Sequence, residues 1–378
     1  MNIAPLAAPR LEIDLGKIHH NAVTLVDRLH QRGISVTGVT KSTLGLPEIA
    51  RTWLRAGVRG LGDSRLQNIQ RMRAAHVSST MTLLRSPMPS QANQVVTQTE
   101  VSLNTELDVI TSLSKAAQKN NCVHGIVLMV ELGDLREGIM PELLEKTVRT
   151  VLSLPNILFM GIGTNLACRS GVSPDATNMG QLSSLADSLD ATFGPIVNTV
   201  SGGNSANLIW ALSGNNTGRI NNLRLGEALL LGCEPLHRTV IKGLHPSAIT
   251  LFAEIIELKT KPAQPWGKLA QAAFGEVLPG SQRGTITQAI LAIGRQDTDP
   301  DGLTPPPGIK ILAASSDHLV VDVSNYRSSL QVGSEIPFQL DYSALLRAMT
   351  SPFISQILKK PDPNRIASKA GAFVSPLP

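Results

Sequence analysis

Short apolar runs alternate with helix-like segments through the first two thirds of the chain, and this alternation limits the possible folds more than any other feature. Most of the apolar runs are followed directly by a segment with helical patterning. Eight runs can be counted, near Ile34, Gly60, Met81, Val101, Ile126, Phe159, Val197 and Leu223. Eight β-then-α units over about 200 residues predict a (β/α)8 barrel of the TIM type. An open doubly wound sheet gives similar alternation, so the number of units favours the barrel.

After about residue 240 the pattern changes to β-rich runs separated by segments rich in proline and glycine. The runs read AITLFAEIIELKTK, TITQAILAIG, IKILAASSDHLVVDVS and SEIPFQL. They predict an antiparallel β domain after the barrel. We therefore expect the barrel over residues 11–240, the C-terminal β domain over 241–350, and an arm that could be partly disordered over 351–378.

Composition describes an ordinary globular protein, with 42% hydrophobic and 17% charged residues. The 34 Lys and Arg residues are scattered, so the net charge of +5 does not indicate a nucleic-acid partner. Cys122, Cys168 and Cys233 are widely spaced and form no Cys/His metal pattern, as expected of free thiols in a reducing compartment. We find neither a secretory leader nor an apolar run long enough for a membrane span, so we expect a cytoplasmic protein.

A lysine stands where the first barrel strand ends, in the run GVTKSTL. In a (β/α)8 barrel the chemistry is located at the C-terminal ends of the strands. If Thr37, Val39 and Lys41 share one face, the alternation directs the amine of Lys41 into the barrel mouth. Such an amine can condense with a carbonyl, although a lysine that merely extends from a strand end would look the same.

Two turns suited to a phosphate follow the last two strands. Gly202, Gly203 and Ser205 lie between the seventh strand and a helix, and Gly226 follows the eighth strand. Phosphate sites in this fold are commonly located at these turns. A lysine at strand one and two such turns suit pyridoxal phosphate, held covalently at one end and by its phosphate at the other.

Several runs, taken together, resemble the alanine racemase family, barrel-fold enzymes that use pyridoxal phosphate, and its ornithine/alanine racemase branch most of all. The resemblance covers about residues 11–345. It is carried by LEIDLGKIHHN, GVTKSTLGLPEIA, GLGDSRLQNI, GIGTNLAC, SGGNSANL, LRLGEALLLG, AILAIGRQD and ASSDHLVVDV. Each run alone is a weak signal, but the joint set is strong.

The resemblance implies a role for particular residues. Lys41 would carry pyridoxal phosphate covalently and act as one of two acid–base groups. Arg136 matches an arginine that contacts the ring oxygen, and Asn165 falls where the family often has a histidine near the ring. The remaining cofactor contacts implied are Ser205, Gly226, Glu227 and Tyr342 for the phosphate and Arg224 for the pyridine nitrogen.

The position of Arg224 opposite the pyridine nitrogen, which the resemblance implies, bears on the type of reaction. A carboxylate opposite the pyridine nitrogen would keep that nitrogen protonated and drain charge from Cα fully into the ring. An arginine cannot accept the proton, so the nitrogen stays neutral and the charge is less delocalised. Prompt return of a proton to Cα then favours racemisation over transamination.

The sequence departs from the family at the second acid–base group, which racemisation requires on the opposite face of the substrate. The family supplies a tyrosine there, but this chain has Arg295, and an arginine with a pKa above about 12 is a poor base. The tyrosine expected four residues after Lys41 is also missing, because Gly45 occupies that position. His318 and Asp317, in SSDH, are our candidates, with Asp297 of IGRQD as a further carboxylate.

The departures also bear on substrate and assembly. Asp297, Asp134 and Glu137 could pair with a cationic side chain such as that of ornithine or lysine, or could be ordinary surface carboxylates. The resemblance implies a homodimer with its site at the subunit interface. Two alternatives stay open: a D-amino-acid lyase or aldolase of the same fold, and a non-catalytic pyridoxal-phosphate-binding protein. The former use a His/Cys or His/Asp pair two residues apart, which the β domain lacks, and the latter lack the β domain.

Overall fold

The computed structural model describes residues 8–214, 216–271, 274 and 284–360. The chain divides into two compact units, Lys17–His245 and a second one that combines Met1–Gly16 with Pro246–Pro378. Among the described residues, no helix has both the length and the apolar character needed to cross a membrane.

Eight parallel strands close into a barrel in the first unit, in the sequence order β2 to β9. The closed order and the parallel pairing of β2 with β9 confirm the predicted (β/α)8 fold. The strands are β2 (Ser35–Val39), β3 (Gly60–Asp63), β4 (Met81–Leu83), β5 (Val101–Asn104), β6 (His124–Met129), β7 (Ile157–Gly163), β8 (Thr199–Ser201) and β9 (Asn222–Leu225).

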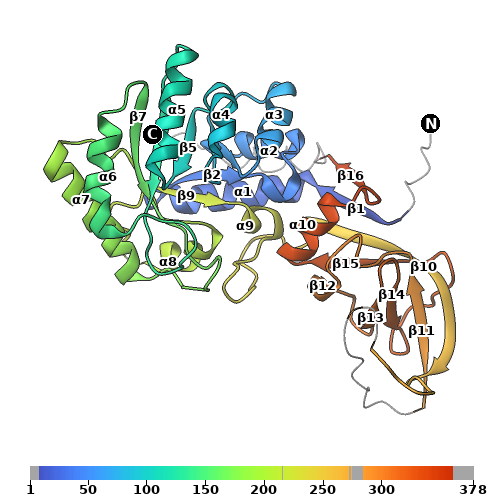
Figure 1. Cartoon of the computed structure of the whole chain (residues 1–378). Coiled ribbons are helices and arrows are strands. Elements are labelled where there is room, and N and C mark those ends of the chain that lie inside the picture. The colour runs from blue at the N-terminus through green and yellow to red at the C-terminus, as the bar shows by residue number, and fades with distance from the viewer. Residues whose placement is uncertain (1–7, 215, 272–273, 275–283, 361–378) are drawn as a thin grey trace, which may run out of the picture. The chain divides into compact units, whose positions relative to one another are not determined.

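Helices connect these strands and lie outside the barrel (Figure 1). Proline at the first position starts two of them, because its fixed φ suits a helix and its missing N–H is not needed there. The helices are α1 (Leu15–His30), α2 (Pro47–Arg55), α3 (Leu66–Ala74), α4 (Ala92–Gln98), α5 (Leu107–Lys119), α6 (Pro141–Leu152), α7 (Ala176–Phe193), α8 (Leu208–Leu212) and α9 (Glu227–Leu231).

The barrel core includes strands that are buried on both faces, of which β6 is the longest. All six residues of β6 are buried, as expected of a parallel strand covered by helices. Leu103, Val127 and Met129 form a buried apolar cluster, with Leu84, Val101 and Met160 packed against it. This apolar cluster contributes to the core of the first unit.

The second unit is an eight-stranded sheet, mainly antiparallel, which confirms the predicted β domain. Strand β1 (Arg10–Asp14) pairs with β10 and with β16, so the start of the chain belongs to this sheet. The segment predicted as an arm contributes β16, and its residues from 361 onward lie outside the described residues. The other elements are β10 (Ile249–Pro262), β11 (Thr285–Leu291), β12 (Leu303–Thr304), β13 (Lys310–Ala314), β14 (Leu319–Asp322), β15 (Glu335–Leu340), α10 (Tyr342–Thr350) and β16 (Ser355–Lys359).

A histidine is buried at the start of β6. The imidazole Nε2 of His124 lies 2.8 Å from the Ser102 hydroxyl, which also accepts a hydrogen bond from Asn104 Nδ2 at 2.9 Å. Burial lowers the pKa of His124 to about 4. The imidazole is therefore neutral in the folded protein at pH values well above 4.

This burial predicts a dependence of stability on pH. Below pH 6.5 the unfolded chain binds a proton that folded His124 does not, so stability falls as pH drops toward 4. From pH 7 to pH 5 the loss is about 2 kcal/mol of unfolding free energy. Urea titrations of the protein and of His124→Gln at both pH values measure it, and the variant should lose most of this difference. An equal pH dependence in both proteins would contradict the assignment.

Candidate active site

Lys41 lies two residues beyond the end of β2, at the start of a 3-10 turn that spans Lys41–Thr43. The strand ends earlier than the alternation predicted, because Thr40 leaves the extended conformation, with φ −88° and ψ −1°. Lys41 is half-buried, whereas Thr40 is fully buried. The lysine is thus placed at the C-terminal end of the barrel, as predicted, but on a turn that Thr40 anchors.

Thr40 is anchored by a buried carboxylate at the end of β3. Its hydroxyl donates to Asp63 Oδ2 at 2.7 Å, and its N–H donates to the carbonyl of Gly62 at 2.9 Å. Burial raises the pKa of Asp63, and the hydrogen bonds from Thr40, Arg65 and Asn68 partly offset that rise. The sequence analysis assigned no role to Asp63.

Arg224 on β9 is buried and held by neutral oxygens. Its Nη1 donates to Ser201 Oγ at 2.5 Å, and its Nη2 donates to the Thr164 carbonyl at 2.7 Å and to Asn165 Oδ1 at 3.4 Å. Burial lowers the pKa of Arg224 to about 10. The guanidinium remains protonated at neutral pH and has a fixed direction.

The network around Arg224 continues to the strand that precedes Lys41. Ser201 Oγ donates to Asn222 Oδ1 at 2.7 Å, and Asn222 Nδ2 donates to Thr37 Oγ1 at 3.0 Å. Asn222 and Arg224 are two residues apart on β9, so they share one face. Ser201 and Asn222 were not among the residues singled out in the sequence, and Thr37 was named there only for sharing a face with Lys41. Polar residues at two-residue spacing on barrel strands were the signal that could have found them.

The turns after β8 and β9 lie together, as the phosphate hypothesis requires. The N–H of Ala228 donates to Ser205 Oγ at 3.3 Å, which links the two turns directly. Gly203 has φ +143°, and a Cβ there would lie 2.1 Å from Asn207 Oδ1. A Cβ on Gly226 would lie 3.0 Å from the Val39 carbonyl, at the end of β2. Both glycines allow a close approach of backbone segments that a side chain would hinder.

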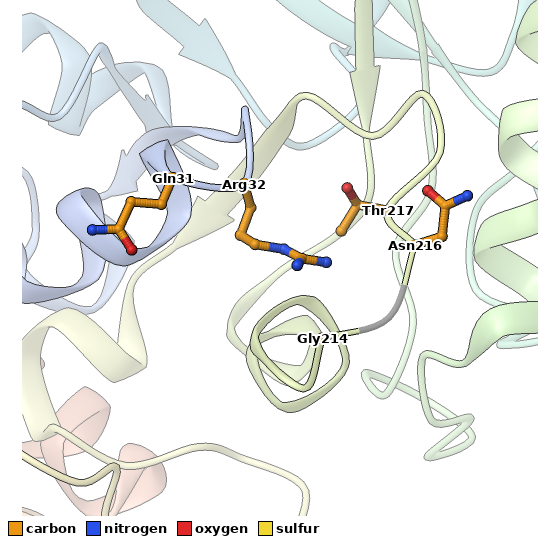
Figure 2. A pocket seen from close by; sticks show the side chains of 5 residues that line it. All are labelled: Gln31, Arg32, Gly214, Asn216 and Thr217. Atoms are coloured by element: carbon orange, nitrogen blue, oxygen red, sulfur yellow. The ribbon is translucent and has the colours of Figure 1, made fainter.

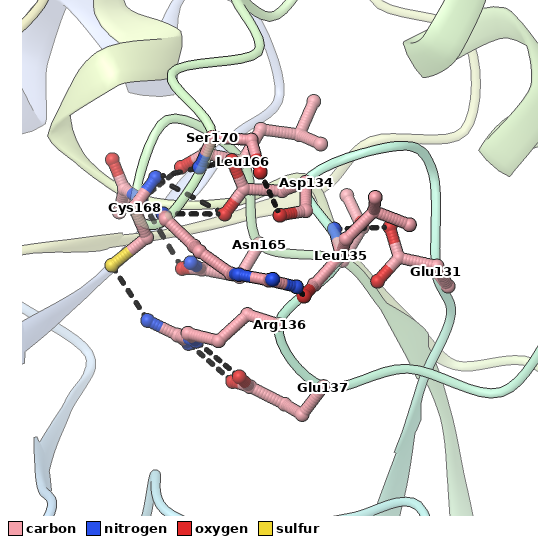
Figure 3. Close-up of polar contacts among 12 residues, drawn as sticks. Glu131, Asp134, Leu135, Arg136, Glu137, Asn165, Leu166, Cys168 and Ser170 are labelled. Atoms are coloured by element: carbon pink, nitrogen blue, oxygen red, sulfur yellow. Dashed lines mark hydrogen bonds and ion pairs between the residues drawn. The ribbon is translucent and has the colours of Figure 1, made fainter.

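The loops after β6 and β7 hold Arg136 and Asn165 (Figure 3). Arg136 pairs with Glu137 through two hydrogen bonds and donates to Cys168 Sγ at 2.6 Å. Asn165 Oδ1 accepts hydrogen bonds from Asn204 at 3.1 Å and from Arg224, which joins this loop to the Arg224 network. The structure therefore brings Asn165 and Arg224 together and places Arg136 on the neighbouring loop.

Asp134 and Glu137, considered as partners for a cationic substrate, are engaged within these loops. Asp134 is 1% exposed and accepts hydrogen bonds from the backbone N–H groups of Arg169 and Ser170 at 2.9 and 3.0 Å. Burial acts to raise the pKa of Asp134, but these backbone bonds outweigh it and hold the pKa below its usual value. The contacts favour a structural role for Asp134 over substrate binding.

The candidates of the second unit gather on two adjacent loops. His318 Nδ1 lies 3.0 Å from Asp317 Oδ1, and the two side chains are 45% and 68% exposed. The N–H of Arg295 donates to the Ser315 carbonyl at 2.9 Å, which holds the IGRQD loop against the SSDH turn. Figure 1 shows the strands β11, β13 and β14 that end at these loops.

Asp297 and Arg295 have partners inside this unit. Asp297 is buried and accepts hydrogen bonds from the Gly294 N–H at 3.0 Å and from the Ser351 hydroxyl at 3.2 Å. These contacts favour a turn-forming role for Asp297, and its contact with a substrate, one of two alternatives left open by the sequence, stays a prediction. Arg295 Nη1 lies 3.8 Å from Asp301, consistent with a weak surface pair.

Tyr342 is half-buried at the first position of α10, next to Asp341, whose carboxylate accepts the Ala344 N–H at 2.9 Å. Within the described part of the chain, no group of three His, Cys, Asp or Glu side chains is arranged to hold a metal ion.

The barrel also has a polar pocket of about 420 Å³ at its other end (Figure 2). Gln31 and Arg32 precede β2, and Asn216 and Thr217 precede β9, so the pocket lies at the N-terminal ends of these strands. Chemistry in this fold is located at the opposite, C-terminal ends. The pocket is therefore separate from the candidate active site.

Comparison with known proteins agrees with this architecture and site. Residues 13–234 match the family described as alanine racemase, N-terminal domain. The chain therefore belongs to the alanine racemase family, which confirms the resemblance found in the sequence.

Among its relatives, an ornithine racemase of Acetoanaerobium sticklandii is 38% identical over 352 residues, or 93% of this chain and 99% of that protein. A lysine racemase of Thermotoga maritima is 37% identical over 350 residues, which are 92% of this chain and 98% of that protein. Among solved structures, an alanine racemase of Clostridium difficile 630 has a TM-score of 0.72 at 17% identity, covering 94% of this chain and 97% of that one. A D-threonine aldolase from Filomicrobium marinum has a TM-score of 0.72 at 14% identity, covering 92% and 89%. These two structures support the fold alone.

The turn after Lys41 predicts a measurable cost at Gly45, where the sequence led us to expect a tyrosine. Gly45 has φ +64°, and a Cβ would lie 2.5 Å from the backbone oxygen of Asn68. Gly45→Ala should therefore lower the unfolding free energy by about 2 kcal/mol or more. Gly33, with φ +71° and open space around it, is a matched control, and Gly33→Ala should cost about 1 kcal/mol. Urea titration compares them, and equal costs would contradict the close packing.

Proposed function

We propose that this protein is an amino-acid racemase that uses pyridoxal phosphate and acts on ornithine or another basic amino acid. The observation that carries the proposal is the buried Arg224 on the strand next to the one that leads to Lys41. In the β2–β9 register, Arg224 pairs with Thr37, four residues before Lys41. The names of the ornithine and lysine racemases support a basic substrate.

The residues of the barrel fit the cofactor. Asn165 Nδ2 is buried and has no hydrogen-bond partner among the described residues, so it is a donor that a ring substituent would satisfy. Arg224 offers a protonated guanidinium to the pyridine nitrogen, and Arg136 would contact the ring oxygen. In this proposal Ser205, Gly226, Glu227 and Tyr342 contact the phosphate.

When bound, pyridoxal phosphate supplies an electron sink next to Cα of the amino acid. Lys41 Nζ would hold the cofactor, and the same amine would accept and return the Cα proton on one face. Arg224, with a pKa of about 10, keeps its own proton and cannot accept another, so it holds the ring nitrogen neutral. That limits the spread of charge and favours return of a proton to Cα.

The second acid–base group is assigned to His318, with Asp317 as its orienting partner. The 3.0 Å contact between His318 Nδ1 and Asp317 Oδ1 engages one ring nitrogen, and Nε2 would carry out the proton transfer. Their exposed fractions of 45% and 68% leave the pair accessible. The proposal includes a homodimer whose β units supply this group to the active sites.

Deuterium incorporation at Cα in D2O tests the reaction and both bases. The protein loaded with pyridoxal phosphate should label L- and D-ornithine faster than L- and D-alanine, as measured by mass spectrometry. Lys41→Ala should slow labelling by a factor of about 10³ or more, because the covalent anchor and one base are lost. His318→Asn should slow labelling of one enantiomer by a factor of about 100 and affect the other less.

Exposed residues of the same type provide the controls. Lys115→Ala and His30→Asn change exposed side chains of α5 and α1, and both should label at the unmodified rate. Labelling of none of the amino acids by the unmodified protein would refute the racemase. Labelling at the normal rate by Lys41→Ala would refute the assignment of Lys41 to the active site. Labelling of both enantiomers at the normal rate by His318→Asn would refute the assignment of His318 as the second acid–base group.

A further inference from the structure

A buried carboxylate next to the lysine turn divides its two oxygens between different neighbours. Asp63 is fully buried at the end of β3. Its Oδ1 accepts the Arg65 N–H at 2.9 Å and the Asn68 side-chain amide at 3.0 Å, at the start of α3. Its Oδ2 accepts the Thr40 hydroxyl at 2.7 Å. Hydrogen bonds to Oδ1 alone would be enough to begin α3. The bond between Oδ2 and Thr40, just after β2, therefore serves another purpose.

Thr40 controls the whole turn that carries Lys41. Its carbonyl accepts the N–H of Thr43 at 3.0 Å, the hydroxyl of Thr43 at 3.0 Å and the N–H of Gly45 at 3.2 Å. Gly45, two residues beyond the turn, is closely packed against Asn68, because a Cβ on Gly45 would lie 2.5 Å from the Asn68 backbone oxygen. The backbone of 40–45 is therefore hydrogen-bonded to Asp63 at one end, through Thr40, and at the other end packs against Asn68, which itself donates a hydrogen bond to Asp63.

We propose that Asp63, acting through the hydroxyl of Thr40, is the positioning residue that sets the direction of Lys41; this inference rests on the proposed function. Lysine has a flexible four-carbon side chain, so its amine is directed only as well as its backbone is fixed. An error of about 1 Å in the position of a reacting group can cost a factor of 100 in rate. The Asp63–Thr40 bond supplies that restraint from the end of a strand that is buried throughout.

The division of the oxygens makes a clean test possible. Thr40→Val removes the hydroxyl at nearly constant shape and leaves the contacts of Oδ1 with α3 intact, whereas Thr40→Ser keeps the hydroxyl. Asp63→Asn alters the acceptor of the same hydrogen bond. Each protein is loaded with pyridoxal phosphate, and its visible circular dichroism per bound cofactor is recorded at about 420 nm, together with kcat, KM and the melting temperature.

Thr40→Val should bind the cofactor but lose roughly half or more of the dichroism, because the attached ring is less fixed. Its kcat should fall by a factor of about 10 to 100 with KM within about twofold, whereas Thr40→Ser stays within about threefold of normal. If Asp63 and Thr40 act through their one hydrogen bond, the two substitutions should not add. The kcat of the double variant Thr40→Val, Asp63→Asn should then lie within about threefold of the kcat of the less active single variant.

The outcomes separate this inference from the proposed function. Normal dichroism and normal kcat in Thr40→Val would overturn the positioning role while the racemase stands. An equal loss in Thr40→Ser would also overturn it, because the hydroxyl would then be irrelevant. Absence of a visible band in the unmodified protein would refute the proposed function itself.

Discussion

The burial of one guanidinium inside the barrel is the interaction on which the rest of the site depends. Taking a charge out of water is costly unless its donors find partners. Arg224 meets that condition with a hydroxyl, a backbone carbonyl and a side-chain amide oxygen, from Ser201, Thr164 and Asn165. These three acceptors fix the direction of the guanidinium. Because all three are neutral oxygens, they leave its positive charge in place, whereas a carboxylate partner would neutralise it.

Strand β2 is restrained from both of its neighbours, and this arrangement connects the two halves of the proposed chemistry. It pairs with β9 on one side and with β3 on the other. From β9, Asn222 links the Arg224 network to Thr37, and from β3, Asp63 holds Thr40. The strand that leads to Lys41 is therefore fixed at its middle and at its exit by side chains from adjacent strands.

The fold could be predicted because a parallel barrel repeats one local pattern eight times, and each strand with its helix is visible in the sequence. The exit of β2 was less predictable, since the strand ends at Val39 where Thr40 turns away. Asp63 and Ser201 escaped notice because their partners, Thr40 and Arg224, are 23 residues distant in the sequence. The partners of Asp297 were equally invisible in the sequence, because its contact with Ser351 depends on tertiary packing.

Assignments that rest on family resemblance and those that rest on contacts support one another at Arg224 and Asn165, which the sequence named and the structure joins. The proposed role of Arg224 is tested most directly by ¹⁵N NMR of the protein loaded with pyridoxal phosphate labelled at the ring nitrogen. Our account predicts the chemical shift of a neutral, hydrogen-bonded pyridine nitrogen at pH 7. The shift of a protonated pyridinium would contradict it.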